Sequence, residues 1–151
     1  HRGGGCRSGR ERGAGMSVPA FTDVGLPTQP AVVFLHGVGG GRQGWASQQA
    51  LVAHMGWRSL AWDMPGYGDS PLTGALSFNS LAKSLELLLN KANVQKAVLV
   101  GHSMGGLIAA RAVANSLPHI DALVMSSPVP GFITSKVLPD LAACHWPLMN
   151  C

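Results

Sequence analysis

One stretch of the sequence constrains the fold more than any other, the run VLVGHSMGGLIAAR at residues 98–111. A short apolar segment passes directly into the pattern Gly-x-Ser-x-Gly, and small, helix-compatible residues follow at once. This order fits a sharp turn from a strand into a helix, at which glycines on both sides of Ser103 let the backbone pass closely. The chain has 20 glycines in 151 residues, so chance alone can produce the pattern. The segments around the pattern therefore decide whether it is a functional motif or a chance occurrence.

The rest of the chain alternates short apolar runs with helical patterns. The apolar runs predict strands at residues 31–35, 58–62, 96–100 and 121–127, with one more strand within 17–25. Helices are predicted at 45–55, with Leu51, Val52 and Met55 at helical spacing, at 78–93, with Ser77 as its N-cap, and at 103–117. Strands that alternate with helices indicate an α/β fold, with a mostly parallel sheet and helices on both faces.

Three unusual loops follow predicted strands: HGVGGGRQG, DMPGYGDSP and GHSMG. In an open parallel sheet, ligands bind at the carboxyl ends of the strands, where these loops lie. The sharp turn lifts the Ser103 hydroxyl above the sheet, and the Met104 backbone N–H points toward an oxyanion formed on an attacked carbonyl. The Val38 N–H, from the neighbouring strand end, is a candidate second donor. Two backbone donors from two loops are what acyl transfer requires.

The segments VVFLHGVGG, WDMPGYGDS and LVGHSMGG, in this order and at this spacing, resemble three motifs of the α/β-hydrolase fold family. These are the oxyanion loop, the fourth-strand loop and the nucleophile elbow of its esterase, lactonase and carbon–carbon hydrolase branch. The resemblance runs from about Ala31 to Pro128. It implies a hydrolase that needs no cofactor and acts on ester, lactone or thioester carbonyls, or on activated carbon–carbon bonds, through an acyl-serine.

The same resemblance assigns roles around the elbow. It implies Ser103 as the nucleophile and the backbone N–H groups of Val38 and Met104 as the oxyanion hole. The supporting positions surround them: His36, Gly37, Gly101, His102 and Gly105. His36 matches a family histidine that hydrogen-bonds the loop backbone. His102 occupies the variable position of the elbow, where a side chain packs or contacts a neighbouring loop.

No Asp, Glu or His in this sequence matches the position of the acid or of the base that such a mechanism uses. The family order is Ser, then Asp or Glu, then His, because the hydroxyl needs a base to remove its proton. Asp63 precedes Ser103 and matches a structural family position, so it is not nominated. Four candidates follow Ser103: His119, Asp121, Asp140 and His145. The first pair is expected at the amino end of the last strand, on the wrong side of the sheet, and the second pair lies five residues apart in the C-terminal tail.

Little or no activity is therefore expected from this chain, although its family is enzymatic. The alternative hypothesis is a non-catalytic interaction or receptor-like module built on the hydrolase scaffold. A metal site is not expected, because the histidines are too scattered for ligand pairs at short spacing. The predicted partner is a small-molecule substrate with an ester-like carbonyl.

Three segments of different character are expected along the chain. Residues 1–15 are rich in Gly and Arg and lack the apolar side chains that would order them; residues 16–132 form a partial α/β-hydrolase domain; residues 133–151 form an atypical tail. Family members are longer, so the chain looks like the first half of a hydrolase, through truncation, an alternative transcript or a frame shift. A sheet cut at this point exposes an edge, through which we expect the chain to oligomerise.

The net charge of +4 belongs mostly to the N-terminus, because residues 1–15 contain four arginines and one glutamate. No basic face is left to bind nucleic acid. No apolar run approaches the roughly 20 residues of a membrane-spanning helix. Three cysteines without zinc-type or redox spacing indicate a reducing compartment, so the expected location is cytoplasmic, with an Arg-rich organelle presequence as the alternative.

Overall fold

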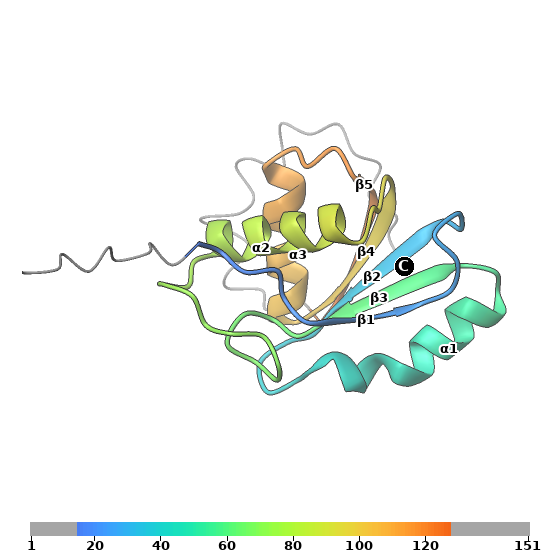
Figure 1. Ribbon diagram of the computed structural model, residues 1–151, viewed down its shortest axis with the longest axis horizontal. Helices are drawn as coiled ribbons and strands as arrows, with labels where there is room; N and C mark the ends of the chain where they lie inside the picture. Colours follow the sequence, from blue (N-terminus) through green and yellow to red (C-terminus); the bar gives the residue numbers. More distant parts are fainter. Residues whose placement is uncertain (1–14, 128–151) are drawn as a thin grey trace, which may run out of the picture.

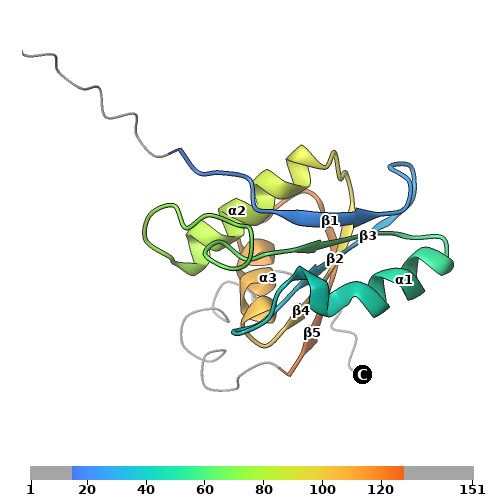
Figure 2. The same ribbon diagram turned by 60° about the horizontal axis from the view of Figure 1, so that its bottom comes forward.

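The computed structural model describes residues 15–127 and contains one five-stranded sheet with the strand order β1-β3-β2-β4-β5. The strands are β1 (Phe21–Val24), β2 (Ala31–Leu35), β3 (Arg58–Trp62), β4 (Ala97–His102) and β5 (Ile120–Ser126). The helices are α1 (Ala46–His54), α2 (Phe78–Lys91) and α3 (Met104–Ala114), with a short 3-10 helix η1 (Arg42–Trp45). β1 runs antiparallel to β3, and the other pairs are parallel. Helices α2 and α3 cover one face of the sheet and α1 covers the other (Figure 1, Figure 2), which confirms the predicted fold class.

The apolar runs at residues 31–35 and 58–62 form the strands β2 and β3, as the sequence predicts. Every residue of β2 and β3 is buried, as expected for parallel strands that are covered on both faces. The register between β2 and β4 pairs Leu35 with Gly101, so these two strands end side by side. The loop after β2 and the turn after β4 therefore emerge at the same edge of the sheet.

The helix α2 has the capped start and the apolar stripe that the sequence predicts. The Ser77 hydroxyl accepts a hydrogen bond from the Ser80 N–H at 3.0 Å, and the Ser80 hydroxyl accepts one from the Ser77 N–H at 2.9 Å. This reciprocal pair is a capping box. The apolar stripe is buried in the main core between α2, α3 and the sheet: Leu81, Leu85, Leu88, Leu89 and Ala92.

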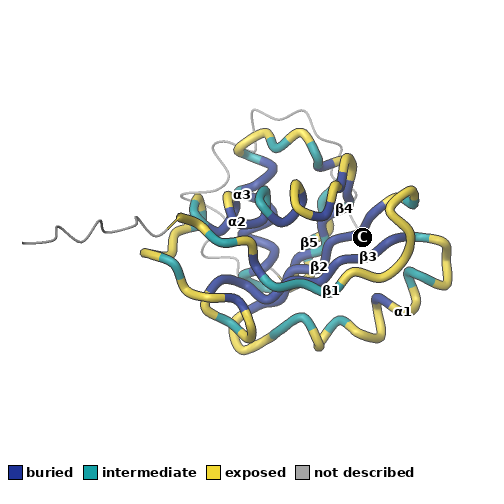
Figure 3. The backbone as a smooth tube through the Cα atoms, in the orientation of Figure 1, coloured by how far each residue is buried: buried dark blue, intermediate teal, exposed yellow. Residues whose placement is uncertain are grey.

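The helix α1 forms where it is predicted, but most of its apolar residues do not face the core. Most of α1 is exposed or half-buried (Figure 3). Leu51 and Met55 are 61% and 66% exposed, and the buried residue of the helix is Gln49. The Gln49 amide donates a hydrogen bond to the Ser59 carbonyl at 3.3 Å and accepts one from the Thr22 hydroxyl at 2.9 Å. The hydrogen bonds of Gln49 thus fix this helix to β3 and β1. The spacing of apolar residues in the sequence does not reveal these contacts.

An ion pair between the buried Arg58 and the more exposed Asp23 ties β1 to the sheet. Arg58 is 4% exposed and donates hydrogen bonds to both carboxylate oxygens of Asp23, at 2.9 and 2.6 Å, and to the Ala92 carbonyl at 2.8 Å. These hydrogen bonds to Asp23, together with its negative charge, raise the pKa of Arg58 despite the opposing effect of burial. The charged guanidinium holds the antiparallel strand β1 against β3.

The strand β5 forms one edge of the described sheet. Its middle residues are apolar. Helix α1 packs against β3 and β1, at the far end of the sheet from β5, so it does not cover Val124, which is 49% exposed. Among the described helices, none has both the length and the apolar character needed to span a membrane.

Self-association through this edge remains a prediction, and it has a direct test. We expect light scattering to report oligomers of the full chain, and we expect Val124→Lys to shift them toward monomer because an edge lysine opposes strand pairing. Leu51→Lys is the matched control, since Leu51 is also exposed but lies on α1. A monomeric wild-type chain at high concentration would contradict the expectation.

Candidate active site

Ser103 stands alone between a strand and a helix. β4 ends at His102 and α3 begins at Met104, and Ser103 has φ 52° and ψ −120°. Non-glycine residues rarely adopt a positive φ, because such strain costs on the order of 1–3 kcal/mol and persists only where neighbouring contacts hold it. Here the Ser103 N–H donates to the Ser126 carbonyl of β5 at 2.9 Å, and the Gly106 N–H donates to the Ser103 carbonyl at 3.0 Å. The elbow that the sequence predicts is present.

Glycines surround this elbow because no side chain fits there. A Cβ on Gly101 would overlap the backbone of Gly105 and Gly106, and a Cβ on Gly105 would overlap the Leu35 carbonyl. A Cβ on Gly37 would lie 3.0 Å from the Ser103 Cβ and 3.5 Å from its Oγ. The loop after β2 therefore touches the elbow directly.

The loop after β2 makes a tight turn whose apex is Val38. The Gly40 N–H donates to the Gly37 carbonyl at 3.1 Å, and Gly39 has φ 77°, as the third residue of a type II turn requires. Val38 is 73% exposed, and its N–H donates to no other described residue. The Met104 N–H opens α3, where the first amides have no acceptor within the helix. Both predicted amide donors are thus available to a ligand.

His36 is buried and both of its ring nitrogens are engaged. Its Nε2 accepts a hydrogen bond from the Met64 N–H at 3.0 Å, so the proton is on Nδ1, which donates to the Gly37 carbonyl at 2.8 Å. The Tyr67 ring packs against the imidazole with a centroid distance of 5.2 Å. These contacts fix the start of the loop and leave His36 no free nitrogen to take a proton from Ser103.

Asp63 is also fully engaged. Its carboxylate accepts hydrogen bonds from the backbone and side chain of Arg42 and from the Asp69 N–H. The same loop adds two further hydrogen bonds: Asp69 accepts one from Arg42, and the Ser70 hydroxyl donates one to the Asp63 carbonyl. The sequence analysis did not identify Arg42 as part of the site. The signal available in the sequence was a single arginine after a run of glycines, with two aspartates, Asp63 and Asp69, in the loop after the next strand.

A hollow of about 420 Å³ adjoins Ser103 at the carboxyl edge of the sheet. The loop after β2 forms one wall, and Trp45, Gln48 and His102 complete it. Trp45 stacks on Phe34 with a centroid distance of 4.9 Å, which braces this wall against the sheet. His102 is exposed, as the variable position of the elbow leads one to expect.

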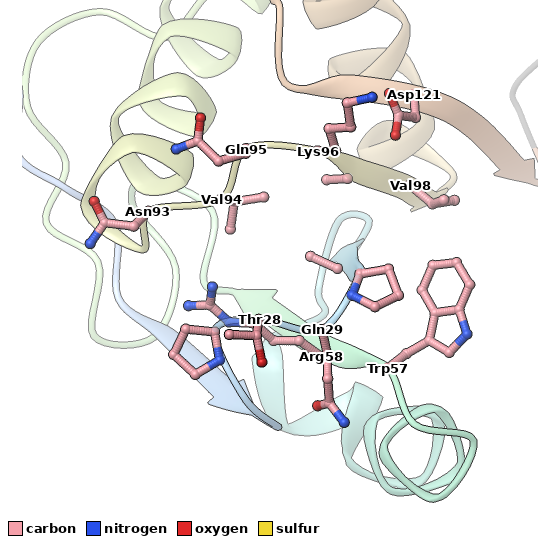
Figure 4. Close-up of a pocket in the computed structure, with 14 residues that line it drawn as sticks. Thr28, Gln29, Trp57, Arg58, Asn93, Val94, Gln95, Lys96, Val98 and Asp121 are labelled. Atoms are coloured by element: carbon pink, nitrogen blue, oxygen red, sulfur yellow. The ribbon is translucent and has the colours of Figure 1, made fainter.

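A second hollow, of about 490 Å³, lies at the opposite, amino edge of the parallel strands (Figure 4). Trp57, Arg58, Lys96 and Asp121 are among its lining residues. Asp121 is the second residue of β5 and Ser126 is the last, so about 16 Å of strand separates the edges that they occupy. The larger hollow is therefore remote from Ser103.

The predicted acid and base candidates do not meet Ser103 in the described part of the chain. His119 precedes β5, and its carbonyl accepts a hydrogen bond from the Ala97 N–H, the first residue of β4. His119 and Asp121 thus lie at the amino edge, as expected from the sequence. Asp140 and His145 lie outside the described residues. Within residues 15–127, no group of three or more His, Cys, Asp or Glu side chains could hold a metal ion.

Comparisons with known proteins agree on one family. The model of the alpha/beta hydrolase fold matches residues 30–147. A 2-succinyl-6-hydroxy-2,4-cyclohexadiene-1-carboxylate synthase from Klebsiella pneumoniae is 32% identical over 116 residues, 77% of this chain and 45% of that protein. An sn-1-specific diacylglycerol lipase from Mus musculus is 41% identical over 83 residues, 54% of this chain and 27% of that protein.

Solved structures agree with the sequence relatives. A structure described among carboxylesterases of the thaumarchaeon Nitrososphaera gargenis superimposes with a TM-score of 0.69 at 28% identity, covering 74% of this chain and 42% of that chain. A bromoperoxidase from Bacillus anthracis gives a TM-score of 0.67 at 28% identity, covering 73% and 40%. The chain thus spans less than half the length of these relatives. It belongs to the α/β-hydrolase fold family.

Proposed function

We propose that Ser103 is the nucleophile of a serine hydrolase site, with the Val38 and Met104 amides as its oxyanion hole. The observation that carries the proposal is the strained Ser103 backbone, at φ 52° between β4 and α3, in contact with the Gly37 loop. The substrates would be esters, lactones or thioesters, or compounds with an activated carbon–carbon bond. The names of the relatives, which include a lipase and a carboxylesterase structure, support the esters among these substrates.

In the proposed reaction, the Ser103 Oγ bonds to the carbonyl carbon and its proton passes to a base. The carbonyl oxygen becomes an oxyanion, which the two amides stabilise in the tetrahedral intermediate. Collapse of this intermediate re-forms the carbonyl, and the bond to the leaving group breaks as that group takes up the proton. Water then hydrolyses the acyl-Ser103 and releases the acid.

The weak point of this site is the proton transfer. Within residues 15–127, His36 has both ring nitrogens engaged, and His119 lies at the opposite edge of the sheet. We assign His102 to the wall of the hollow rather than to the chemistry. A site with a nucleophile and an oxyanion hole but without a triad partner retains on the order of 10³–10⁴-fold catalysis over water. We therefore propose that this chain acylates slowly.

Hydrolysis of p-nitrophenyl acetate tests this function. We expect the chain to accelerate release of p-nitrophenol slowly, added imidazole to raise the rate further as an external base, after subtraction of the release that imidazole gives without protein, and Ser103→Ala to abolish both effects. His102→Ala should leave the rate unchanged. Equal rates for wild type and Ser103→Ala would refute the nucleophile, and rapid turnover by the chain alone would refute the impairment. With no Ser103-dependent rate, specific ligand binding by a folded chain would favour the non-catalytic module instead.

A further inference from the structure

Three charged side chains join the end of the glycine-rich loop to the loop that follows β3. Arg42 donates from Nη1 to Asp63 Oδ2 at 2.7 Å and from Nη2 to Asp69 Oδ2 at 2.6 Å. The Arg42 backbone N–H donates to the other Asp63 oxygen at 2.9 Å. Asp63 thus holds both the main chain and the side chain of the residue at which η1 begins.

Asp63 is itself immobilised. Its side chain is 1% exposed, and its carboxylate accepts a further hydrogen bond from the Asp69 N–H at 3.1 Å. Its N–H donates to the Ala20 carbonyl at 2.8 Å, and its carbonyl accepts a hydrogen bond from the Ser70 hydroxyl at 2.6 Å. A Cβ on Gly68 would overlap the carboxylate, so the loop after β3 wraps closely around it. These partners hold the buried Asp63 carboxylate in one position, so that it can fix the position of Arg42.

The loop between His36 and Arg42 is therefore held at both ends by the two residues that follow β3, Asp63 and Met64. At its start, His36 accepts a hydrogen bond from the Met64 N–H, and at its end Arg42 binds Asp63. Four of the five residues between them are glycines, which leave the backbone free to adopt many conformations. The position of the Val38 N–H in this segment then depends on how firmly the two ends are held.

We infer that Arg42 and Asp63 are positioning residues that place the Val38 amide at the oxyanion hole. The inference rests on the proposed function of Ser103 and adds two residues that touch neither nucleophile nor substrate. A displacement of about 1 Å at a reacting centre can cost about 10²-fold in rate. The planar guanidinium of Arg42 keeps a fixed orientation on the buried Asp63 carboxylate, which the flexible and strongly hydrated ammonium of lysine does not reproduce.

The test compares Arg42→Lys with Asp69→Asn. Arg42→Lys keeps a cation beside the buried Asp63 but loses the planar guanidinium, whereas Asp69→Asn removes the outer pair, whose carboxylate is 73% exposed, and keeps Arg42 on Asp63. The probe is phenylboronic acid, whose tetrahedral adduct with serine mimics the oxyanion intermediate and is followed by boron NMR. We expect Arg42→Lys to weaken adduct formation about tenfold and Asp69→Asn to leave it near wild type.

Amide hydrogen exchange separates positioning from a general structural role. Positioning predicts faster exchange of the Gly40 N–H, which closes the turn on the Gly37 carbonyl, in Arg42→Lys, with the protection of β4 and α3 unchanged. Unchanged boronate affinity in Arg42→Lys would overturn the inference, and so would a loss of protection that extends through β4 and α3. If wild type forms no more adduct than Ser103→Ala, the proposed function fails by itself. Exchange of the Gly40 N–H then reports on the anchor alone: selective acceleration shows that Arg42 and Asp63 hold the loop, and no change overturns the inference.

Discussion

Replacing Gly105 with alanine should destabilise the fold more than any other single methyl group added at the elbow. The new Cβ would overlap the Leu35 carbonyl oxygen and lie 2.7 Å from the His36 carbonyl oxygen. Both are backbone atoms at the end of β2, so neither can rotate away as a side chain would. Overpacking typically costs about 1–3 kcal/mol, and a clash with rigid backbone belongs at or above the top of that range. Urea unfolding followed by circular dichroism measures the loss.

The adjacent glycine provides the control for this prediction. A Cβ on Gly106 would lie 3.2 Å from the Gly101 carbonyl oxygen and 3.4 Å from the Met125 side chain, which can move. Alanine also favours a helix over glycine by about 1 kcal/mol. Gly106→Ala should therefore stay close to wild type. Equal free energies of unfolding for the two variants would mean that α3 does not press against the end of β2 as described.

Replacing Val38 with proline should remove the proposed oxyanion donor without disturbing the turn that carries it. Val38 is the second residue of the turn closed by Gly40 and Gly37, and proline is favoured at that position of a type II turn. Its side chain is at an exposed apex, so a proline ring has room. Loss of one oxyanion donor typically costs about 10²–10³-fold in rate. Acylation of Ser103 should fall by that factor, measured as the burst of p-nitrophenol.

Val38→Ala is the matched variant, because it shortens the same side chain and keeps the N–H. It should acylate at the wild-type rate. The urea midpoint of Val38→Pro should be equal to or above that of wild type, since proline restricts the unfolded chain. If Val38→Pro and Val38→Ala acylate equally fast, the Val38 amide is not an oxyanion donor, whatever the role of Ser103.

Local patterns in the sequence predict most of the framework. Strands β2 and β3 are continuous apolar runs between loops rich in Gly, Pro or Asp, so their bounds match the prediction. The elbow is predictable because a strand, Gly-x-Ser-x-Gly and a helix follow one another without a gap. The start of α2 is predictable because the Ser77 cap acts within one turn of helix.

The parts that the sequence does not predict depend on contacts between distant residues. The buried face of α1 is set by Gln49, whose partners lie on β1 and β3. Arg42 meets Asp63 and Asp69 across 21 and 27 residues, so no local pattern links them. The spacing of Leu51, Val52 and Met55 predicts the helix correctly, but Leu51 and Met55 are exposed, because tertiary packing decides which face of a weakly amphipathic helix is buried.

The most direct test of the account is to find where an acyl donor reacts. The full chain and Ser103→Ala are each incubated with p-nitrophenyl butyrate, and intact mass and peptide mapping locate the butyryl group. We predict one adduct, on Ser103, which forms faster when imidazole is present and is missing from the variant. Butyryl groups spread over several serines, or equal labelling of the two proteins, would contradict the claim that this elbow holds a nucleophile.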